Sequence, residues 1–434
     1  MKLFFTGLCL LSFMQTGGNP SLNISTVTEP PGAGMLSDNS RYEAPGGSMA
    51  KCMDQAWKVS WERFFLPGTQ MFYDYLSSYE PGRGLDHLPK TEEVKKQFPN
   101  VYGYDTGMED CMISAGVMLS MIVDQYSVTR NVKLRKNAFS VFKGIQLSAS
   151  VEDAPGFLAR CVCAEDRKSV YINSSRDQYT HAVHGLWKYY NSPLCTKEVK
   201  IEIGKVLSAF ADRMTRNVTA ANDYDFLRAD GARDTRGISR MWHVGAHEAA
   251  RLPMIYAAAW NTTGNKEYFE SYRHYVKDAI DQSFDIAKNT TTYGLLQMQC
   301  SMELLGSLEQ DTDLKVKIRQ IEEKVSGLCA GRAENADDRA RNLDLTMVGT
   351  DWRTGEGLKP KGEYRKVWYC IRESGEAALT QLMSEKTAYP ESQQQLLTRA
   401  IKRLDYQKVS SNGIFYLQAA YWKARQTGIF TKSD

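Results

Sequence analysis

The segment from residue 242 to residue 288 has the sequence WHVGAHEAARLPMIYAAAW-NTTGN-KEYFESYRHYVKDAIDQSFDIAK. Its first part is dense in apolar and aromatic residues, whereas the part after the turn at 261–265 spaces charged and apolar residues as an amphipathic helix does. The polar, glycine-containing turn separates two predicted helices, 242–261 and 266–288. An apolar helix followed by an amphipathic one is typical of a helical hairpin with an inner and an outer member.

Similar helical patterns recur from residue 48 to residue 430, and strand-type alternation is scarce. We expect about twelve helices, at 50–65, 69–78, 108–128, 177–190, 197–216, 242–261, 266–288, 293–308, 313–329, 369–384, 392–405 and 413–427. Helices in inner and outer pairs predict an all-α fold, an (α/α)6 toroid that forms one catalytic domain over residues 48–430. A solenoid is disfavoured because no fixed repeat period is present, and a two-domain helical bundle is the remaining alternative.

The first residues predict export. Residues 1–18 combine a short charged start with an apolar run that is too short to span a bilayer, which is typical of a signal peptide, and residues 19–47 form a polar segment. We therefore expect a periplasmic or secreted protein without membrane insertion. The 54 basic and 51 acidic residues leave a net charge of +3 without a basic run, so nucleic acid is not an expected partner.

Eight cysteines follow the predicted signal peptide, and none of them has CxxC spacing. We expect no zinc site, mostly buried thiols inside helices and at most one or two disulfides, whose pairing the sequence leaves open. No metal and no cofactor is predicted.

Three long connections, 80–107, 220–241 and 330–367, each exceed about fifteen residues, a length that is more often functional or disordered than incidental. They carry Trp, Tyr, Arg, Asp and Gly residues. In a toroid they lie on the face where the inner helices begin, and we expect them to wall a pocket there.

Two predicted inner helices start with acidic residues. Residues 102–111, YGYDTGMEDC, place Glu109 and Asp110 in a first helical turn, where the helix dipole alone favours acids, although Asp110 can also face a cavity. Residues 173–181, NSSRDQYTH, place Asp177, Gln178, Tyr179 and His181 at the next start. Capping explains part of this second pattern, but its polarity exceeds what an inward helix needs, which favours a role in function.

Two further stretches carry candidate binding residues. Trp242, His243 and Glu248 are predicted to supply a sugar-stacking plane and a titratable pair, and Arg251 is predicted to pair with Glu248; the HxxxHE order lacks the glutamate position of a zinc protease. Trp352 and Arg353 in a long loop, followed by Arg372, suit recognition of a ring with hydroxyl or carboxylate groups, although Trp352 could equally anchor the loop.

Cleavage of a glycosidic bond needs one protonated and one ionised carboxyl group. Asp110 and Asp177 are the predicted pair because each opens a separate inner helix, and Glu248 is a third candidate. The sequence has no GxSxG elbow, no phosphate-binding loop and no dinucleotide fingerprint.

The motifs GMEDC, SRDQY followed by GLW, and EAARL, on three successive inner helices, resemble the six-hairpin glycosidases that Bacteroidetes use on polysaccharides, such as unsaturated glucuronyl hydrolases and the β-glucuronidases of glycoside hydrolase family 154. The resemblance implies a glycoside hydrolase whose two catalytic aspartates match Asp110 and Asp177. It also implies a uronic-acid-containing oligosaccharide as substrate, with Arg353 or Arg372 as the partner of its carboxylate.

Two other functions fit the same patterns. A toroidal polysaccharide lyase would use a Tyr or His base, for which Tyr179, His181 and His243 are the candidates. A non-catalytic glycan-binding protein would use the aromatic residues and would tolerate replacement of Asp110 and Asp177. The oligomeric state is not predicted.

Overall fold

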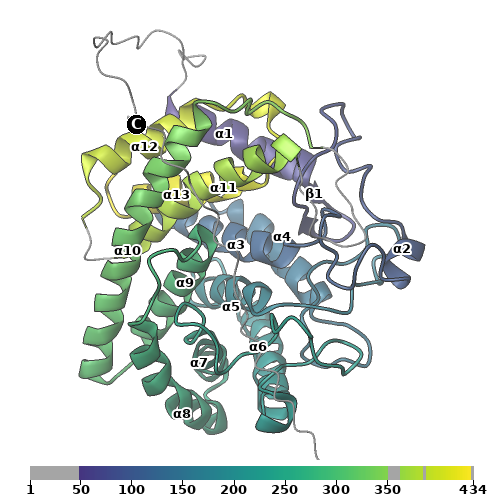
Figure 1. Cartoon of the computed structure of the whole chain (residues 1–434), viewed down its shortest axis with the longest axis vertical. Helices are drawn as coiled ribbons and strands as arrows, with labels where there is room; N and C mark the ends of the chain where they lie inside the picture. The colour runs from purple at the N-terminus through teal and green to yellow at the C-terminus, as the bar shows by residue number, and fades with distance from the viewer. Residues whose placement is uncertain (1–47, 350–361, 385–387, 432–434) are drawn as a thin grey trace, which may run out of the picture. The chain divides into compact units, whose positions relative to one another are not determined.

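The computed structural model describes residues 48–349, 362–384 and 388–431, which belong to one compact unit. Six of the helices in these residues form a closed inner ring, in which each helix packs against the next and the last packs against the first (Figure 1). The inner helices are α3 (Cys111–Thr129), α5 (Arg176–Tyr190), α7 (Arg251–Thr263), α9 (Thr292–Leu308), α11 (Gly362–Met383) and α13 (Gly413–Gln426).

Six outer helices pack against the inner ones. They are α1 (Met49–Val59), α4 (Leu134–Ser148), α6 (Lys197–Asn217), α8 (Lys266–Ser283), α10 (Thr312–Ala340) and α12 (Glu391–Lys402). The short elements in the described ranges are η1 (Ser60–Phe64), β1 (Phe65–Leu66), β2 (Met71–Phe72), α2 (Thr91–Lys95), η2 (Ala220–Asn222) and η3 (Tyr406–Lys408), and β1 pairs with β2 in antiparallel fashion. Inner and outer helices that alternate along the chain make the predicted (α/α)6 toroid.

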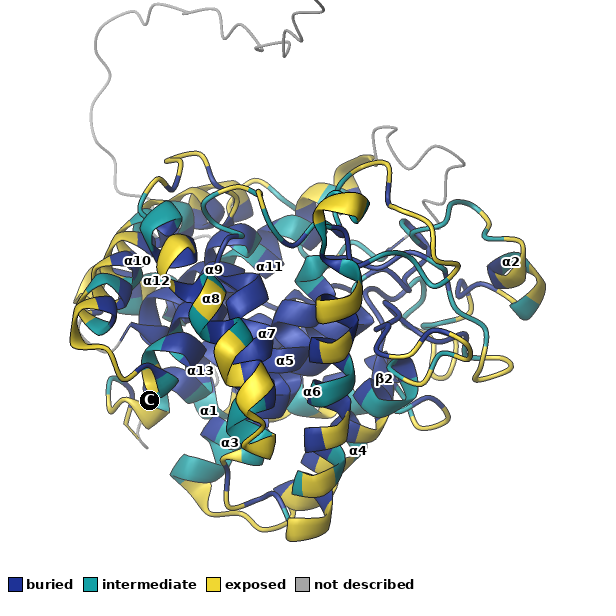
Figure 2. Cartoon of the chain, turned by 90° about the horizontal axis from the view of Figure 1, so that it is seen from below, coloured by how far each residue is buried: buried dark blue, intermediate teal, exposed yellow. Residues whose placement is uncertain are grey.

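The two rings differ in burial as their sequences require. The inner helices α5 and α7 are buried over most of their surface, whereas an outer helix such as α8 is buried on one side only (Figure 2). On α8 the buried side chains include Tyr268, Tyr272, Val276 and Ile280, which recur every four residues. Helix α3 is long and apolar enough to cross a membrane, but 72% of its apolar window is buried inside the protein, as in a core helix.

Close helix packing near the candidate site depends on two glycines. A Cβ atom on Gly116 of α3 would lie 2.0 Å from the carbonyl oxygen of His181, and one on Gly185 of α5 would lie 2.7 Å from the carbonyl oxygen of Gly116. Only residues without side chains allow this approach. The glycines thus bring together the two helices that carry the predicted acids.

The predicted number of about twelve helices agrees with the twelve helices of the two rings, although one predicted helix is absent and one helix of the rings was not predicted. Residues 69–78 are not helical: they contain β2, and Gln70 has a φ of 60°. The prediction missed α4, whose helical pattern is interrupted by Gly144. A Cβ atom on Gly144 would lie 2.1 Å from the carbonyl oxygen of Gln70, so the glycine admits the segment that was mistaken for a helix.

The largest shifts of predicted boundaries are at α7, α10 and α11, and α11 begins at Gly362 rather than at residue 369. Helix α7 begins at Arg251 rather than at residue 242. Pro253 then lies in the first turn, where backbone N–H groups have no partner within the helix, so the missing N–H of proline costs no hydrogen bond. Helix α10 continues to Ala340. The predicted signal peptide and polar segment lie outside the described residues.

Candidate functional site

A pocket of about 300 Å³ lies where several inner helices begin. We call it the acid pocket; its lining residues are Tyr104, Asp105, Glu109, Asp110, Ile113, Arg160, Asp177, Arg236, Tyr293, Gln297, Arg365, Trp368, Tyr369 and Arg372. The predicted pair Asp110 and Asp177 lines this one pocket, together with Glu109 and Arg372. All three stretches predicted as long connections contribute to its wall, through Tyr104, Arg236 and Arg365, although the structure places Arg365 in α11.

Three carboxyl groups gather at the start of α3. The Oδ2 atom of Asp74 accepts hydrogen bonds from the backbone N–H groups of Glu109 and Asp110 at 2.9 and 3.0 Å. Asp74 therefore satisfies helix-terminal donors from a distant part of the chain. Burial raises the pKa of Asp74 well above its usual range, and the charges of Asp110 and Glu109 act in the same direction.

Glu109 is the acid of this group whose pKa lies near neutral pH. Burial raises its pKa to about 7, the charge of Asp110 adds to the rise, and the guanidinium groups of Arg365 and Arg160 oppose it. Its Oε2 atom accepts the backbone N–H of Asp105 at 3.0 Å. A carboxyl group that is partly protonated at neutral pH is suited to proton transfer.

Asp110 lies among cationic and amide donors. Its Oδ2 atom accepts a hydrogen bond from Nη1 of Arg372 at 2.7 Å, and its Oδ1 atom accepts one from Nε2 of Gln178 at 3.2 Å. Arg160 lies 3.9 Å from the same carboxylate. Arg372 also donates to Glu376 at 2.6 Å, so its guanidinium is held by two carboxylates.

Asp177 differs from Glu109 in its proton affinity. Burial alone would raise its pKa, but the charges of Arg251 and Arg176 outweigh burial and lower it. Nη1 of Arg251 donates to Asp177, and Nη2 donates to Gln297 at 2.6 Å. The prediction that Arg251 pairs with Glu248 is therefore wrong, because the guanidinium of Arg251 lies in the ring and Glu248 lies on the loop before α7.

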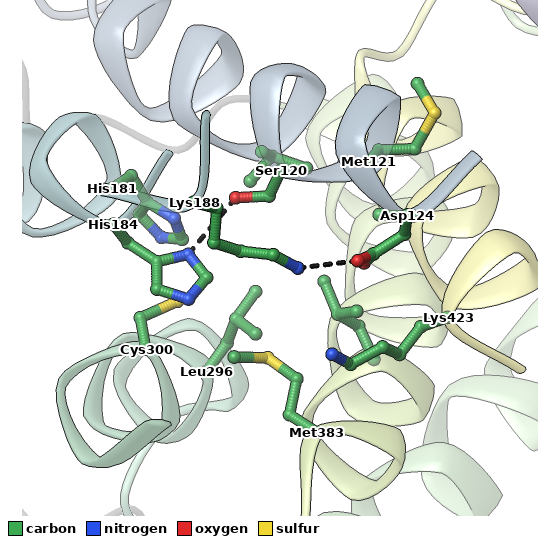
Figure 3. A pocket seen from close by; sticks show the side chains of 13 residues that line it. Ser120, Met121, Asp124, His181, His184, Lys188, Leu296, Cys300, Met383 and Lys423 are labelled. Atoms are coloured by element: carbon green, nitrogen blue, oxygen red, sulfur yellow. Dashed lines mark hydrogen bonds and ion pairs between the residues drawn. The ribbon is translucent and has the colours of Figure 1, made fainter. Parts of the chain in front are cut away.

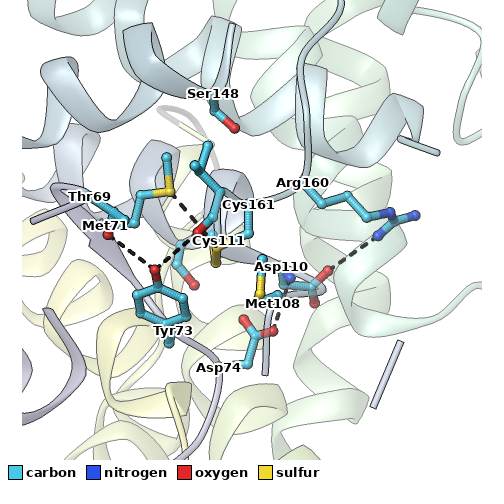
Figure 4. Close-up of a disulfide and its surroundings, with 12 residues drawn as sticks. Thr69, Met71, Tyr73, Asp74, Met108, Asp110, Cys111, Ser148, Arg160 and Cys161 are labelled. Carbon is cyan, nitrogen blue, oxygen red and sulfur yellow. Dashed lines mark hydrogen bonds and ion pairs between the residues drawn. A yellow bond between two sulfur atoms is a disulfide. The ribbon is translucent and has the colours of Figure 1, made fainter. Parts of the chain in front are cut away.

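A disulfide fixes the wall of the acid pocket. Cys111 and Cys161 are joined, and each directly follows a pocket residue, Asp110 and Arg160 (Figure 4). Nη1 of Arg160 also donates to the backbone carbonyl of Glu109 at 3.0 Å. The described free cysteines are all buried, as predicted, although Cys163 and Cys195 lie outside the helices. The six are Cys52, Cys163, Cys195, Cys300, Cys329 and Cys370.

The aromatic side chains of the pocket lie beside arginines. Nε1 of Trp368 donates to the backbone carbonyl of Asp74 at 3.1 Å, and the guanidinium of Arg372 lies 5.1 Å from the centre of the Trp368 ring. The guanidinium of Arg365 lies 4.9 Å from the centre of the Tyr369 ring. Two predicted binding residues, Trp352 and Arg353, lie outside the described residues.

Tyr179 and His181 do not line the acid pocket. The hydroxyl of buried Tyr179 donates to Gly156 at 2.8 Å and accepts from the N–H of Leu158 at 2.9 Å, so it holds a loop against α5. His181 lies one helical turn beyond Asp177 and lines a different, enclosed space. Burial lowers the pKa of His181 to about 3, which keeps the ring neutral. The predictions of direct substrate contact by Tyr179 and His181 are corrected on this ground.

This enclosed space, the inner cavity, has a volume of about 20 Å³ (Figure 3). It is lined by Val117, Ser120, Met121, Asp124, His181, His184, Lys188, Leu296, Cys300, Leu379, Met383, Ala419 and Lys423. Lys188 pairs with Asp124 at 2.8 Å. Glu303 accepts from His184 at 2.6 Å and pairs with Lys423 at 3.0 Å.

The residues predicted on the start of α7 lie elsewhere, because this segment is not helical. Glu248 pairs with Arg176 at 2.5 Å. His243 has a φ of 54°, and the Trp242 ring packs edge-on against Tyr275 with centroids 4.8 Å apart. None of Trp242, His243 and Glu248 lines the acid pocket, so the predictions that they act there are corrected.

His243 and Glu248 line a larger neighbouring hollow of about 630 Å³, which we call the arginine cleft. Its lining residues are Arg176, Asp223, Asp225, Arg233, Asp234, Thr235, Arg236, Gly237, Arg240, His243, Val244 and Glu248. Arg236 lines both this cleft and the acid pocket.

Several residues of the acid pocket were not predicted. Arg160 and Gln297 stand in stretches without a recognisable motif, and only the folded ring brings them beside the acids. Tyr104 and Arg236 stand in the long connections 80–107 and 220–241, which were predicted to wall a pocket. The polar and aromatic residues of these connections could therefore have been predicted as pocket residues. Among the described residues, no group of three or more His, Cys, Asp and Glu side chains is arranged to hold a metal ion.

No protein-family model and no curated protein matches the chain, so no glycosidase family is shown for it. Solved structures with a similar course of the chain include a sugar epimerase from a ruminal bacterium, with 12% identity, a TM-score of 0.47, and coverage of 86% of this chain and 98% of that one. A cellobiose 2-epimerase from Spirochaeta thermophila has 12% identity, a TM-score of 0.45, and coverage of 88% and 98%. A D-mannose isomerase has 10% identity, a TM-score of 0.44, and coverage of 86% and 96%.

Proposed function

We propose that this chain is a glycoside hydrolase that acts on uronic-acid-containing oligosaccharides. One observation carries the proposal: the acid pocket holds two carboxyl groups whose proton affinities are shifted in opposite directions, with the pKa of Glu109 raised to about 7 and that of Asp177 lowered. Glycosidic cleavage uses one carboxyl group in each protonation state.

In this proposal Glu109 donates its proton to the glycosidic oxygen as the bond to the anomeric carbon breaks. Asp177 is ionised and either activates a water molecule or attacks the anomeric carbon itself. Asp110 provides the neighbouring charge that helps to keep Glu109 protonated. The acid is thus assigned to Glu109, the residue next to the aspartate that the sequence favoured.

The lining of the pocket supports an acidic sugar. Arginine forks bind carboxylates through two parallel hydrogen bonds, and Arg236, Arg365 and Arg372 all line the acid pocket. The ring of Tyr369 lies beside Arg365. The volume of the acid pocket, about 300 Å³, is at the lower end of the range for small-molecule sites.

The test uses purified wild type, Glu109→Gln and Asp177→Asn with oligosaccharides that end in a uronic acid. We expect wild type to release a saturated uronic acid and both variants to lose this activity. Binding without turnover by wild type would favour a glycan-binding protein instead. An increase in near-ultraviolet absorbance, which marks an unsaturated uronate, would favour a lyase.

The lyase is the weaker hypothesis because its predicted bases Tyr179, His181 and His243 do not line the acid pocket. Tyr104, which does, has a pKa that burial raises, and this opposes formation of the tyrosinate that β-elimination needs.

We further propose that the chain is exported, on the strength of the signal-like residues 1–18. N-terminal sequencing of the protein recovered from its native host tests this. An intact Met1 would contradict the proposal.

A further inference from the structure

The arginine cleft adjoins the acid pocket, and the proposed chemistry does not use it. One side chain, Arg236, lines both. The residue stands in the long connection 220–241 and is exposed. A ligand that extends beyond the acid pocket toward the cleft therefore passes this guanidinium.

Most arginines of the cleft are already engaged. Arg233 pairs with Asp223 at 2.6 Å, and Arg240 contacts the same carboxylate. Arg176 pairs with Glu248 at 2.5 Å and donates to the carbonyl oxygen of Gly237 at 2.6 Å, which fixes the floor of the cleft.

Arg236 differs from these three. Within the residues that the structure describes, its side chain makes no ion pair and no hydrogen bond, and its guanidinium lies 4.9 Å from the centre of the Tyr102 ring and 5.2 Å from that of Tyr104. The two rings are stacked 5.0 Å apart. A guanidinium over aromatic faces keeps its N–H groups available at the ring edges.

The support beneath Arg236 is rigid. The hydroxyl of Tyr102 donates to Oδ1 of Asp234 at 3.0 Å, and Asn173 donates to the same oxygen at 3.1 Å. Oδ2 of Asp234 accepts the N–H of Ile238 at 2.7 Å. Buried Asp234 thus ties the tyrosine pair to the loop that carries Arg236, which limits the conformational entropy that the arginine loses on binding.

We propose that the arginine cleft is a second sugar subsite and that Arg236 binds the carboxylate of an acidic sugar there. The inference rests on the proposed function, because it extends the substrate of the acid pocket by at least one uronate unit. Uronates carry one carboxylate per ring, and Arg236 offers a planar fork that no carboxylate of the described residues occupies.

The test is calorimetric titration with galacturonate, digalacturonate and trigalacturonate, and with methyl-esterified trigalacturonate as a neutral ligand of equal length. The proteins are wild type, Arg236→Ala, Arg236→Lys and Arg228→Ala. Arg228 is the matched control because it stands in the same loop, pairs with Asp230 and lines neither hollow.

We expect wild type to bind digalacturonate more tightly than galacturonate, and Arg236→Ala to weaken binding of the longer acids by about ten- to hundredfold, the range for charge-assisted hydrogen bonds. Arg236→Lys keeps the charge without the fork and should recover part of the loss. Arg228→Ala should match wild type. Equal binding of the ester and the acid, or an Arg236→Ala variant with the wild-type dependence on length, would overturn the subsite.

Turnover is followed in the same samples, which separates the two proposals. Binding that depends on length and on Arg236 without any hydrolysis would refute the hydrolase and leave the subsite standing. Hydrolysis by a protein that shows no such dependence would do the reverse.

Discussion

The acid pocket and the inner cavity are both lined by charged side chains of the inner helices, and α5 contributes to each of them. Their electrostatics are opposite. In the acid pocket burial raises the pKa of Glu109 to about 7. At the inner cavity burial would also raise the pKa of Glu303, but Lys423, Lys188 and the hydrogen bond from His184 bring it well below its ordinary value.

The contrast separates a structural charge cluster from a reactive one. Glu303 has basic partners at 2.6 and 3.0 Å, and the cavity beside it has only about 20 Å³, room for roughly one water molecule. At the start of α3, carboxyl groups lie beside one another and the open volume is about 300 Å³. Inside the ring, a carboxyl group whose pKa is raised by neighbouring acids, such as Glu109, therefore indicates a reactive site. A carboxyl group paired with basic side chains, such as Glu303, indicates a structural role.

The largest difference between the two regions should be in catalysis. We expect Glu109→Gln to lower kcat about 10²- to 10⁴-fold, the usual contribution of a general acid, as measured by release of uronic acid. Glu303→Gln, assayed at a temperature where it remains folded, should keep kcat within a few-fold of wild type. A Glu109→Gln variant with more than a tenth of wild-type kcat would remove the assignment of the acid.

Stability should show the opposite order. Glu303→Gln removes the carboxylate that both His184 and Lys423 contact, and loss of one member of a buried ion pair costs about 3–5 kcal/mol. Urea unfolding followed by circular dichroism measures this. If the midpoint of Glu303→Gln equals that of wild type, the charges around the inner cavity are not structural.

The two regions should also respond to pH with opposite signs. Glu109 has a raised pKa, so its contribution to stability is complete below 4.5 and is lost as the pH rises through about 7. This rise in the pKa of Glu109, from 4.5 to about 7, corresponds to about 3 kcal/mol of unfolding free energy. Glu303 has a lowered pKa, so its contribution is present above 4.5 and is lost as the pH falls.

Unfolding free energies measured from pH 2 to pH 8 test these signs, because the decline that Glu303 causes lies below pH 4.5. Glu109→Gln should flatten the decline toward pH 8, and Glu303→Gln should flatten the decline toward acid. The same pH profile in wild type and Glu109→Gln would mean that Glu109 does not titrate in this range.

The disulfide should affect both stability and the acid pocket. It closes a separation of 50 residues, for which the expected loss on replacing both cysteines by serine is about 2–4 kcal/mol. Because the disulfide holds the chain beside Asp110 and Arg160, the Cys111→Ser/Cys161→Ser variant should also lose kcat when it is folded. Cys195→Ala, a buried free cysteine remote from the pocket, is the control.

An unchanged kcat in the folded double variant, measured with its unfolding midpoint, would show that the hydrogen bonds of Arg160 suffice to hold the pocket. A large loss in Cys195→Ala would mean that the effect comes from packing instead.

The sequence predicted the ring and the acids better than their surroundings. The pairing of apolar and amphipathic helices is a local pattern, and so are acids at helix starts, which explains why Glu109, Asp110 and Asp177 were found. Arg160 could not be found in this way, because it reaches the pocket through a loop joined to α3 by a disulfide that the sequence left unpaired. Trp242 and His243 were misplaced because the helical pattern of the sequence begins at residue 242, whereas helix α7 begins only at Arg251.

Tyr179 and His181 show a second limit of the sequence. Polar residues on an inner helix look alike in a sequence, whether they face a pocket or an enclosed cavity. Asp177 and His181 are one turn apart on α5, yet one lines the acid pocket and the other the inner cavity. The depth of each residue along the ring axis determines which space its side chain lines. This depth depends on how all the helices of the domain pack, which the sequence pattern of one helix does not contain.

The smallest expected effect concerns the charge of Asp110. Because this charge adds to the rise in the pKa of Glu109, while Arg160 and Arg372 oppose it, Asp110→Asn should lower that pKa. The alkaline limb of the kcat profile, which follows deprotonation of the acid, should then move to lower pH by about one unit or less. A kcat profile of Asp110→Asn measured from pH 4 to pH 9 tests this. If kcat falls while the alkaline limb stays in place, Asp110 itself takes part in the reaction and Glu109 is not the group that titrates.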